Sequence, residues 1–243
     1  YKTNLEKDSD IIGYTSYFQE LINNAPDLEQ VISISENAIS NLKDILSEQQ
    51  STQTIDSEMF EEITASSLVK LDTDGEIVME TDYQVNAAGF TIHSAVHQAR
   101  HDLVCVMHTH TVAGMAVAAQ KVGLLPLAQT SLEFYENLAY HEYEGIAFDL
   151  GERERLVGDL GDKMAMILRN HGLLTCGKSI AQAFTKMHSL EKSCQLQIAA
   201  QAGGDLVLPS ETVCKHTAQQ FRLSENTESE GDLDKLAWTA LLR

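Results

Sequence analysis

The sequence predicts an α/β protein in which helices cover one sheet, and three observations favour this fold class. After residue 60, short apolar runs alternate with helical segments, as in 103–108 followed by 112–121. Turn-forming residues separate neighbouring apolar runs, as in Asn170-His171-Gly172. The chain of 243 residues is 43% hydrophobic, so it can bury a sizeable core within one large domain.

The first 58 residues differ in character from the rest of the chain. Apolar residues at helical spacing run along 28–46, and Pro26 precedes them at a position suited to a first helical turn. The uniform polar stretch 47–57 is typical of a linker. We therefore expect a helical N-terminal segment with a linker over 1–58 and the α/β domain over 59–243. The helix either packs on its own domain or binds a partner.

Within the second part, each element is expected from apolar periodicity and turn residues. A strand over 64–71, a turn containing Asp74-Gly75 and a strand over 75–80 come first, followed by a helix over 90–100. The next expected elements are a strand at 103–108, a helix at 112–121, a strand at 124–129 and a helix at 153–161. Strands at 164–168 and 173–176 then precede a long helix over 179–201. A last helix carries Trp238, which we expect to cover the core or a neighbouring subunit.

Charge and cysteine content exclude several functional classes. The chain has 17 Lys and Arg against 36 Asp and Glu, a net charge of −19, so we expect no nucleic-acid partner. No run reaches the roughly 18 apolar residues of a membrane helix, and we expect no membrane span. The four cysteines lie far apart without a CxxC pair. This spacing is typical of reduced thiols and favours a cytoplasmic location.

Histidines at strand ends are the most informative feature of the sequence. His108 and His110 are two residues apart at the end of an apolar strand, so their side chains lie on one face. His171 stands in the turn before the last predicted strand, beside a glycine. Two strand ends in one sheet can bring three imidazoles to one metal ion. The alternative is three solvated loop histidines.

The run from Glu61 to Gly204 also resembles the class II aldolase/adducin family. The family's motifs follow in order as EEITASSLVKLD (61–72), NAAGFTIHSAVHQAR (86–100), VMHTH (106–110), GLLPLAQTSL (123–132), AYHEYEG (139–145) and ILRNHGLLTCG (167–177). The resemblance implies a three-layer α/β/α fold and a homotetramer with sites between subunits. It also implies a divalent ion, commonly Zn²⁺, held by His108, His110 and His171.

The resemblance implies lyase chemistry with an altered pair of proton-handling residues. Family sugar-phosphate aldolases cleave a carbon–carbon bond beside a metal-bound carbonyl, with a glutamate and a tyrosine moving protons. Those two positions are occupied here by Gly89 and Thr130. The family's phosphate-cradling loop has no match upstream of 61. The substrate expected is therefore a small unphosphorylated hydroxy-carbonyl or carboxylic compound.

Two further residues are candidates for the missing chemistry. Glu133, in SLEFYE, is a candidate proton carrier or fourth ligand, and the alternative is a surface carboxylate. His141, in AYHEYEG, is a candidate substrate donor, and the alternative is a structural hydrogen bond. His93 and His97, four apart on one helix, are expected to have packing roles.

Two functions from different classes follow from these residues. The first is a metal-dependent carbon–carbon lyase that performs aldol cleavage, decarboxylation or a related reaction, with Glu133 or a bound water as proton carrier. The second is a non-catalytic assembly module resembling adducin heads, which would bind cytoskeletal partners of the actin and spectrin type. Gly89 and Thr130 favour the second, and the retained histidines favour the first.

Overall fold

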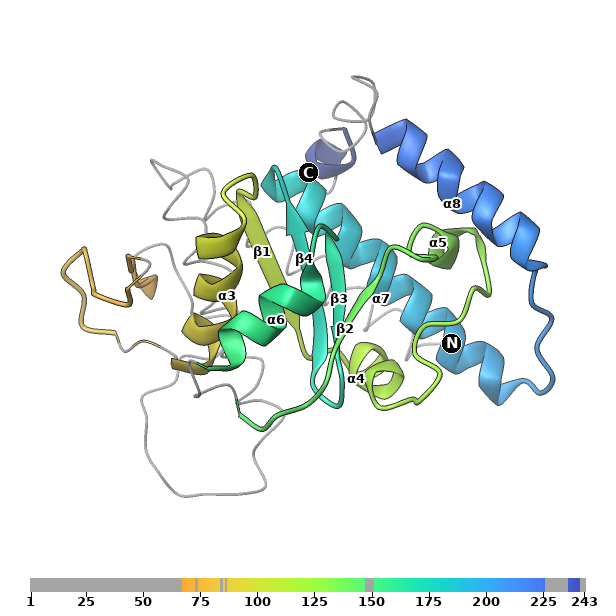
Figure 1. Cartoon of the computed structure of the whole chain (residues 1–243), viewed down its shortest axis with the longest axis horizontal. Helices are drawn as coiled ribbons and strands as arrows, with labels where there is room; N and C mark the ends of the chain where they lie inside the picture. Colours follow the sequence, from red (N-terminus) through yellow and green to blue (C-terminus); the bar gives the residue numbers. More distant parts are fainter. Residues whose placement is uncertain are drawn as a thin grey trace.

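The computed structural model describes residues 67–72, 74–83, 85, 87–146, 151–225 and 236–240 (Figure 1). The predicted N-terminal segment over 1–58 and the first part of the predicted strand at 64–71 lie outside these residues. Among the described residues, no helix combines the length and apolar character needed to cross a membrane.

A mixed sheet with strand order β1-β4-β3-β2 forms the centre of the fold. Its strands are β1 (Cys105–Thr109), β2 (Ala139–His141), β3 (Ala165–Leu168) and β4 (Gly172–Gly177). β4 pairs antiparallel with both β1 and β3, whereas β2 pairs parallel with β3. All residues of β3 and β4 are buried. Both faces of the sheet are covered, which is why these strands are nearly continuous apolar runs in the sequence.

Helices cover both faces of the sheet, which gives the expected three layers (Figure 1). On one face, α3 (Ala87–Ala99) and α6 (Glu152–Leu160) pack on a core that includes Val106 and Leu174. On the other face, α4 (Val112–Ala118) and α7 (Ile180–Ala202) pack on a core that includes Met107 and Leu173. Successive strand residues thus serve opposite cores, as the period of two requires. The predicted fold class is confirmed.

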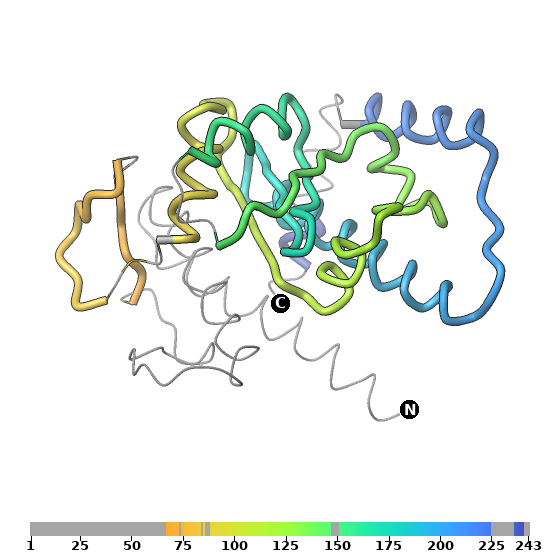
Figure 2. The backbone as a smooth tube through the Cα atoms, turned by 60° about the horizontal axis from the view of Figure 1, so that its bottom comes forward, coloured from red at the N-terminus to blue at the C-terminus, as the bar shows by residue number. Residues whose placement is uncertain are grey.

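The remaining helices lie toward the end of α7. The short α5 (Gln129–Leu132) packs against α7, and α8 (Glu211–Glu225) packs against α5. Figure 2 shows the connection from α7 turning back so that α8 runs along the outside of the molecule. A helical stretch at 236–240 brings the ring of Trp238 to 5.2 Å from that of Phe184 in α7. Trp238 therefore covers the α7 side of the domain.

One predicted strand is wrong: residues 124–128 form no strand, and α5 begins at Gln129. The backbone N–H of Leu124 donates to the hydroxyl of Tyr140, and that of Leu125 donates to Oε1 of Gln197. Pro126 offers no N–H to a neighbouring strand. Side chains distant in sequence therefore satisfy this segment in place of a sheet partner.

The predicted hairpin at 64–80 is reduced to one bridge between Leu71 and Ile77 within the described residues. Oδ1 of Asp72 accepts the backbone N–H groups of Asp74 and Glu76, which closes the turn locally. The turn is therefore where the sequence places it, but residues 67–72 and 74–80 form no extended strand on either side of it.

All four cysteines are free and buried. Burial raises the pKa of Cys105, Cys176 and Cys194 to about 12, so these thiols stay protonated at neutral pH and are poor nucleophiles. That these thiols are reduced in the cell stays a prediction from their spacing.

Candidate metal centre

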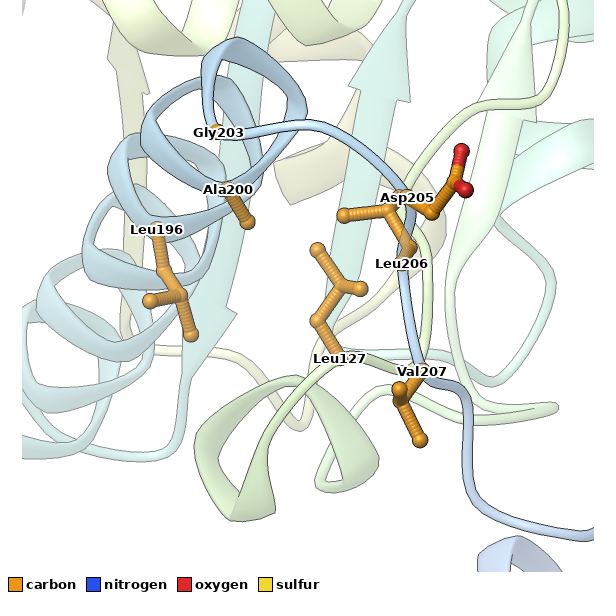
Figure 3. Close-up of a pocket in the computed structure, with 7 residues that line it drawn as sticks. All are labelled: Leu127, Leu196, Ala200, Gly203, Asp205, Leu206 and Val207. Atoms are coloured by element: carbon orange, nitrogen blue, oxygen red, sulfur yellow. The ribbon is translucent and has the colours of Figure 1, made fainter.

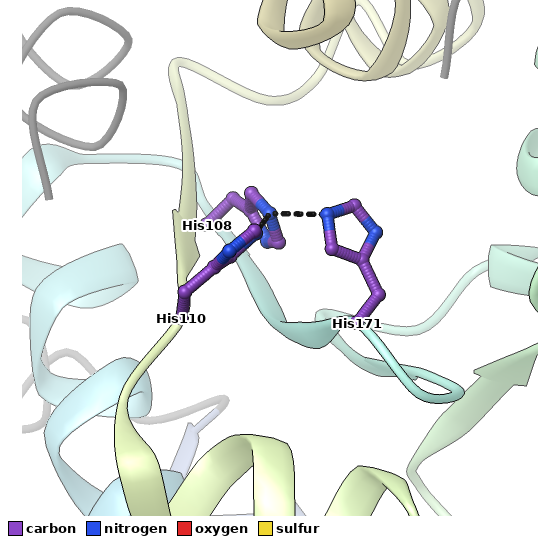
Figure 4. Close-up of side chains that lie close together, drawn as sticks. All are labelled: His108, His110 and His171. Atoms are coloured by element: carbon purple, nitrogen blue, oxygen red, sulfur yellow. Dashed lines mark hydrogen bonds between the residues drawn. The ribbon is translucent and has the colours of Figure 1, made fainter. Parts of the chain in front are cut away.

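Three imidazoles meet where β1 ends beside the turn from β3 to β4 (Figure 4). His108 lies in β1 and is 2% exposed, His110 follows the strand, and His171 lies in the turn. The Nε2 atom of His108 is 2.7 Å from Nε2 of His110 and 3.3 Å from Nε2 of His171. The structure thus brings together the three histidines that the sequence singled out.

A backbone carbonyl fixes the orientation of the most buried ring. Nδ1 of His108 lies 2.8 Å from the carbonyl oxygen of Leu173. A carbonyl oxygen only accepts hydrogen bonds, so Nδ1 of His108 carries the proton and donates it. In the neutral ring, the Nε2 lone pair then points at the other two histidines, as in an imidazole prepared to bind a metal.

The turn that carries His171 depends on two residues with special backbone properties. Asn170 has a φ of 54°, a left-handed conformation that asparagine tolerates better than most residues. A Cβ at Gly172 would lie 2.2 Å from the carbonyl oxygen of Thr109 and 3.2 Å from ring atoms of His108 and His110. Glycine at 172 therefore allows β4 to approach β1 closely enough for the three rings to meet.

Thr111, the residue after His110, is hydrogen-bonded to α7. Thr111 caps α4: its hydroxyl oxygen accepts the N–H of Gly114, and its O–H donates to Oε2 of Glu191 at 2.5 Å. Burial raises the pKa of Glu191, while hydrogen bonds from Thr111 and Gln195 oppose that shift. Sequence reasoning missed Glu191, because 80 residues separate it from Thr111.

The donor set fits a divalent metal. Imidazole nitrogens are common ligands of Zn²⁺ and of other first-row divalent ions. The three ligand nitrogens all lie within 4.8 Å of one another, and in the described part of the chain no carboxylate or thiolate belongs to the group. One ion could therefore contact all three nitrogens and keep a coordination position for another ligand.

The family model for the Class II Aldolase and Adducin N-terminal domain matches residues 45–198. The chain belongs to the class II aldolase/adducin family. Class II aldolases typically depend on a divalent metal, and the three histidines are a group that could bind one. The predicted family is confirmed.

Named relatives come from both branches of the family. A Pseudomonas aeruginosa protein whose name places it provisionally among the class 2 aldolases is 50% identical over 185 residues, 76% of this chain and 71% of that protein. Alpha-adducin of Rattus norvegicus is 46% identical over 151 residues, 60% of this chain. The match covers 20% of the length of the adducin.

One solved structure gives the same family, and a second gives the same fold. The aldolase II superfamily protein from Pseudomonas syringae has a TM-score of 0.73 and 42% sequence identity, covering 91% of this chain and 94% of that one. L-fuculose 1-phosphate aldolase from Glaciozyma antarctica has a TM-score of 0.64 at 24% identity, covering 90% and 92% respectively. The second likeness shows the fold alone.

Glu133, the predicted proton carrier, forms an ion pair with α7. Its Oε1 lies 3.2 Å from Nζ of Lys186. Lys186 is buried, with 7% of its surface exposed. Neither group joins the three histidines within the described residues. A proton-carrying role for Glu133 stays a prediction, and the ion pair to Lys186 supplies a structural role for the same carboxylate.

Removal of that negative charge is expected to destabilise the fold. Glu133→Gln takes the charge away from a nearly buried ammonium. Breaking such a pair from one side costs about 3–5 kcal/mol. The measurement is the urea midpoint of unfolding. Glu136→Gln is the matched control, because its 3.7 Å pair with Lys215 is half exposed and should contribute little. Equal midpoints for the two variants would contradict the prediction.

His141 lies between two carboxylates. Its Nδ1 is 2.8 Å from Oδ2 of Asp159, and its Nε2 is 3.3 Å from Oε1 of Glu152. Both carboxylates belong to α6. The contacts of the His141 ring therefore connect the end of β2 to that helix. A contact with substrate stays a prediction for His141. Gly89 lies in α3 and Thr130 in α5.

Tyr143 lies beside the histidines and was not singled out from the sequence. Its ring centroid is 6.4 Å from that of His171, and the residue is 53% exposed. The signal that could have found it is the parallel pairing of β2 with β3, which carries the chain past His141 alongside the turn.

A groove lies elsewhere, between the end of α7 and the chain that follows it (Figure 3). Its volume is about 290 Å³. The residues that line it are Leu127, Leu196, Ala200, Gly203, Asp205, Leu206 and Val207. None of them is a histidine or belongs to the metal-ligand group, so the groove is separate from the candidate chemistry.

Proposed function

We propose that this chain is a metal-dependent carbon–carbon lyase, of the aldehyde-lyase type, with Zn²⁺ held by His108, His110 and His171. The observation that carries the proposal is that the Nε2 atoms of the three histidines lie close together. The carbonyl of Leu173 fixes the orientation of the His108 ring among them. The alternative of three solvated loop histidines does not explain why His108 is only 2% exposed. It also does not explain why a glycine stands at position 172, where a Cβ would clash.

A divalent ion bound there would act as a Lewis acid toward adjacent oxygens of a substrate and stabilise negative charge beside a carbonyl. The chain's own residues divide the remaining work. His108 closes the inner side of the site, because it is buried, whereas His110 and His171 are half-buried and leave the outer side accessible. Glu133 is the candidate proton carrier of this proposal, and its Oε1 lies 3.2 Å from Nζ of Lys186.

The substrate class of this proposal is a small hydroxy-carbonyl or carboxylic compound without a phosphate. Aldol cleavage or decarboxylation would both use a carbonyl held beside the ion. The unphosphorylated class is the expectation from the sequence, in which no segment between residues 1 and 61 matches the family's phosphate loop. The proposal also includes a homotetramer in the cytoplasm and a division of the chain at residues 58 and 59. The family and the four buried free thiols support the first two of these.

Metal removal tests the lyase proposal directly. Purified protein should contain about one divalent ion per chain and cleave at least one member of a panel of unphosphorylated hydroxy-ketones and 2-hydroxy acids. EDTA should abolish the cleavage, and zinc should restore it. Negligible metal in the purified protein, together with no uptake of added zinc, would overturn the proposal.

A non-catalytic assembly module is the second candidate, favoured by the 46% identity to alpha-adducin and by Gly89 and Thr130. It predicts no turnover of any compound in the panel. It also predicts that the oligomer seen by size-exclusion chromatography survives EDTA. Metal-dependent turnover would exclude this reading of the chain.

A further inference from the structure

The chain that carries two of the three ligands uses its two sides differently. β1 ends at Thr109, and Thr111 still has an extended backbone, so side chains along this segment alternate between two sides. The rings of His108 and His110 meet on one side, with their Nε2 atoms 2.7 Å apart. The hydroxyls of Thr109 and Thr111 contact α7 instead. The long helix therefore lies behind the ligand-bearing segment.

Two residues of α7, one helical turn apart, make these contacts. Sδ of Met187 lies 3.4 Å from Oγ1 of Thr109, but a thioether is only a weak acceptor. Oε2 of Glu191 accepts the hydroxyl of Thr111 at 2.5 Å. A hydrogen bond to a carboxylate is roughly twice as strong as one between neutral groups. The bond between Glu191 and Thr111 is therefore the stronger tie between this segment and α7.

His110 lies between two elements and belongs to neither. The ladder of β1 with β4 ends at Thr109, and α4 begins at Val112. The neighbour of His110 on the helix side is Thr111, the N-cap residue of α4, whose hydroxyl Glu191 accepts. A displacement of Thr111 would rotate the peptide that joins it to His110 and would move the imidazole away from the other two rings.

The carboxylate of Glu191 is itself held in place. Its second oxygen, Oε1, accepts the side-chain N–H of Gln195, one turn further along α7, at 2.8 Å. Each carboxylate oxygen thus has a donor of its own. In the described part of the chain, Glu191 does not join the group of ligand nitrogens. It reaches that group through Thr111, as do the outer partners that orient ligands in metal sites.

We propose that Glu191 is a positioning residue of the metal site, which fixes Thr111 and through it the ring of His110. The inference rests on the proposed metal-dependent function. It gives α7, which contributes none of the three ligand histidines, a part in setting the metal affinity. Without the hydrogen bond, His110 samples more orientations, and the loss of that freedom on binding lowers the affinity.

The test measures the dissociation constant of Zn²⁺ for the full chain, by competition with a chromogenic chelator. Glu191→Met keeps the length of the side chain and removes both acceptor oxygens, so Zn²⁺ should bind about tenfold more weakly. Glu191→Gln retains an oxygen that can accept the Thr111 hydroxyl, and its affinity should stay within about twofold of wild type.

A second substitution removes the same hydrogen bond from the other side. Thr111→Val should weaken Zn²⁺ binding at least as much as Glu191→Met, so the test does not depend on the folding of one variant. In the double variant, Glu191→Met should add no further loss, because the hydroxyl through which Glu191 acts is already absent. Independent, additive losses would overturn the inference.

Thr175→Val is the matched control. It removes another hydroxyl that bonds to α7, since Thr175 in β4 is buried and donates to the carbonyl of Ala183 at 2.9 Å. This variant should lower the thermal midpoint of unfolding and leave the Zn²⁺ affinity unchanged. A loss of affinity equal to that of Glu191→Met would overturn the inference, because general loosening of α7 would then explain both.

Three further results separate a positioning role from the alternatives. A lowered midpoint with unchanged Zn²⁺ affinity in Glu191→Met would make the role purely structural, which overturns the inference and leaves the proposed metal site standing. Equal weakening in Glu191→Gln and Glu191→Met would overturn it too, because the charge and not the hydrogen bond would be responsible. A wild type that binds no Zn²⁺ would remove both the inference and the proposed function.

Discussion

Gly172→Ala is expected to destabilise the protein by about 3 kcal/mol and to abolish metal binding. The added Cβ would stand 2.2 Å from the carbonyl oxygen of Thr109. No rotamer change relieves this clash, because the backbone fixes the position of the Cβ and the oxygen is itself a backbone atom. β4 must therefore move away from β1, which separates His171 from His108 and His110. Overpacking of this kind commonly costs 1–3 kcal/mol, and a backbone clash lies at the upper end. Thermal unfolding and metal analysis of the same sample measure both effects.

Gly158→Ala is the control for this variant. Gly158 lies inside α6, and a Cβ there would meet nothing within 4 Å. Alanine is the better helix former by about 1 kcal/mol, so this variant should be slightly more stable than wild type. An unchanged unfolding midpoint and full metal content in Gly172→Ala would contradict this prediction, because they would show that the turn accommodates a Cβ.

Two members of the metal-ligand group were predictable because their spacing is short-range. His108 and His110 share a face through the period of two along a strand, and His171 precedes a glycine at a turn. The sequence does not state that β1 and β4 are neighbours. That pairing, with His108 opposite Leu174, brings the turn to the strand end. The spacing left the role of His171 open between a metal ligand and a solvated loop residue, whereas the family resemblance implied that it is the third ligand.

Long-range side-chain contacts account for what the sequence did not predict. Residues 124–128 have a strand-like composition, yet their N–H groups bond to Tyr140 and Gln197, up to 72 residues away. Glu191 reaches Thr111 across 80 residues. No local pattern encodes such partners, because each depends on the packing of α7 over the sheet. Tyr143 was hidden for a related reason: its neighbour His171 is defined by strand register.

Substitution of a single ligand is expected to remove most of the metal affinity. In His108→Ala, two imidazoles remain, and the buried nitrogen that Leu173 orients is lost. A group of two half-buried histidines loses the inner contact, so we expect the zinc content to fall from about one ion per chain to below a tenth. His216→Ala is the control, since His216 is an exposed residue of α8.

Thermal unfolding adds a second readout that does not depend on turnover. A ligand that binds only the folded state stabilises it by RT ln(1 + [L]/Kd), about 2.7 kcal/mol at a hundredfold excess over Kd. Zinc should therefore raise the unfolding midpoint of the wild type and of His216→Ala by several degrees, and EDTA should reverse the shift. His108→Ala should show almost none of it. A zinc-dependent shift of equal size in His108→Ala would place the binding site elsewhere, because zinc that stabilises the fold without the most buried imidazole cannot be held by these three rings.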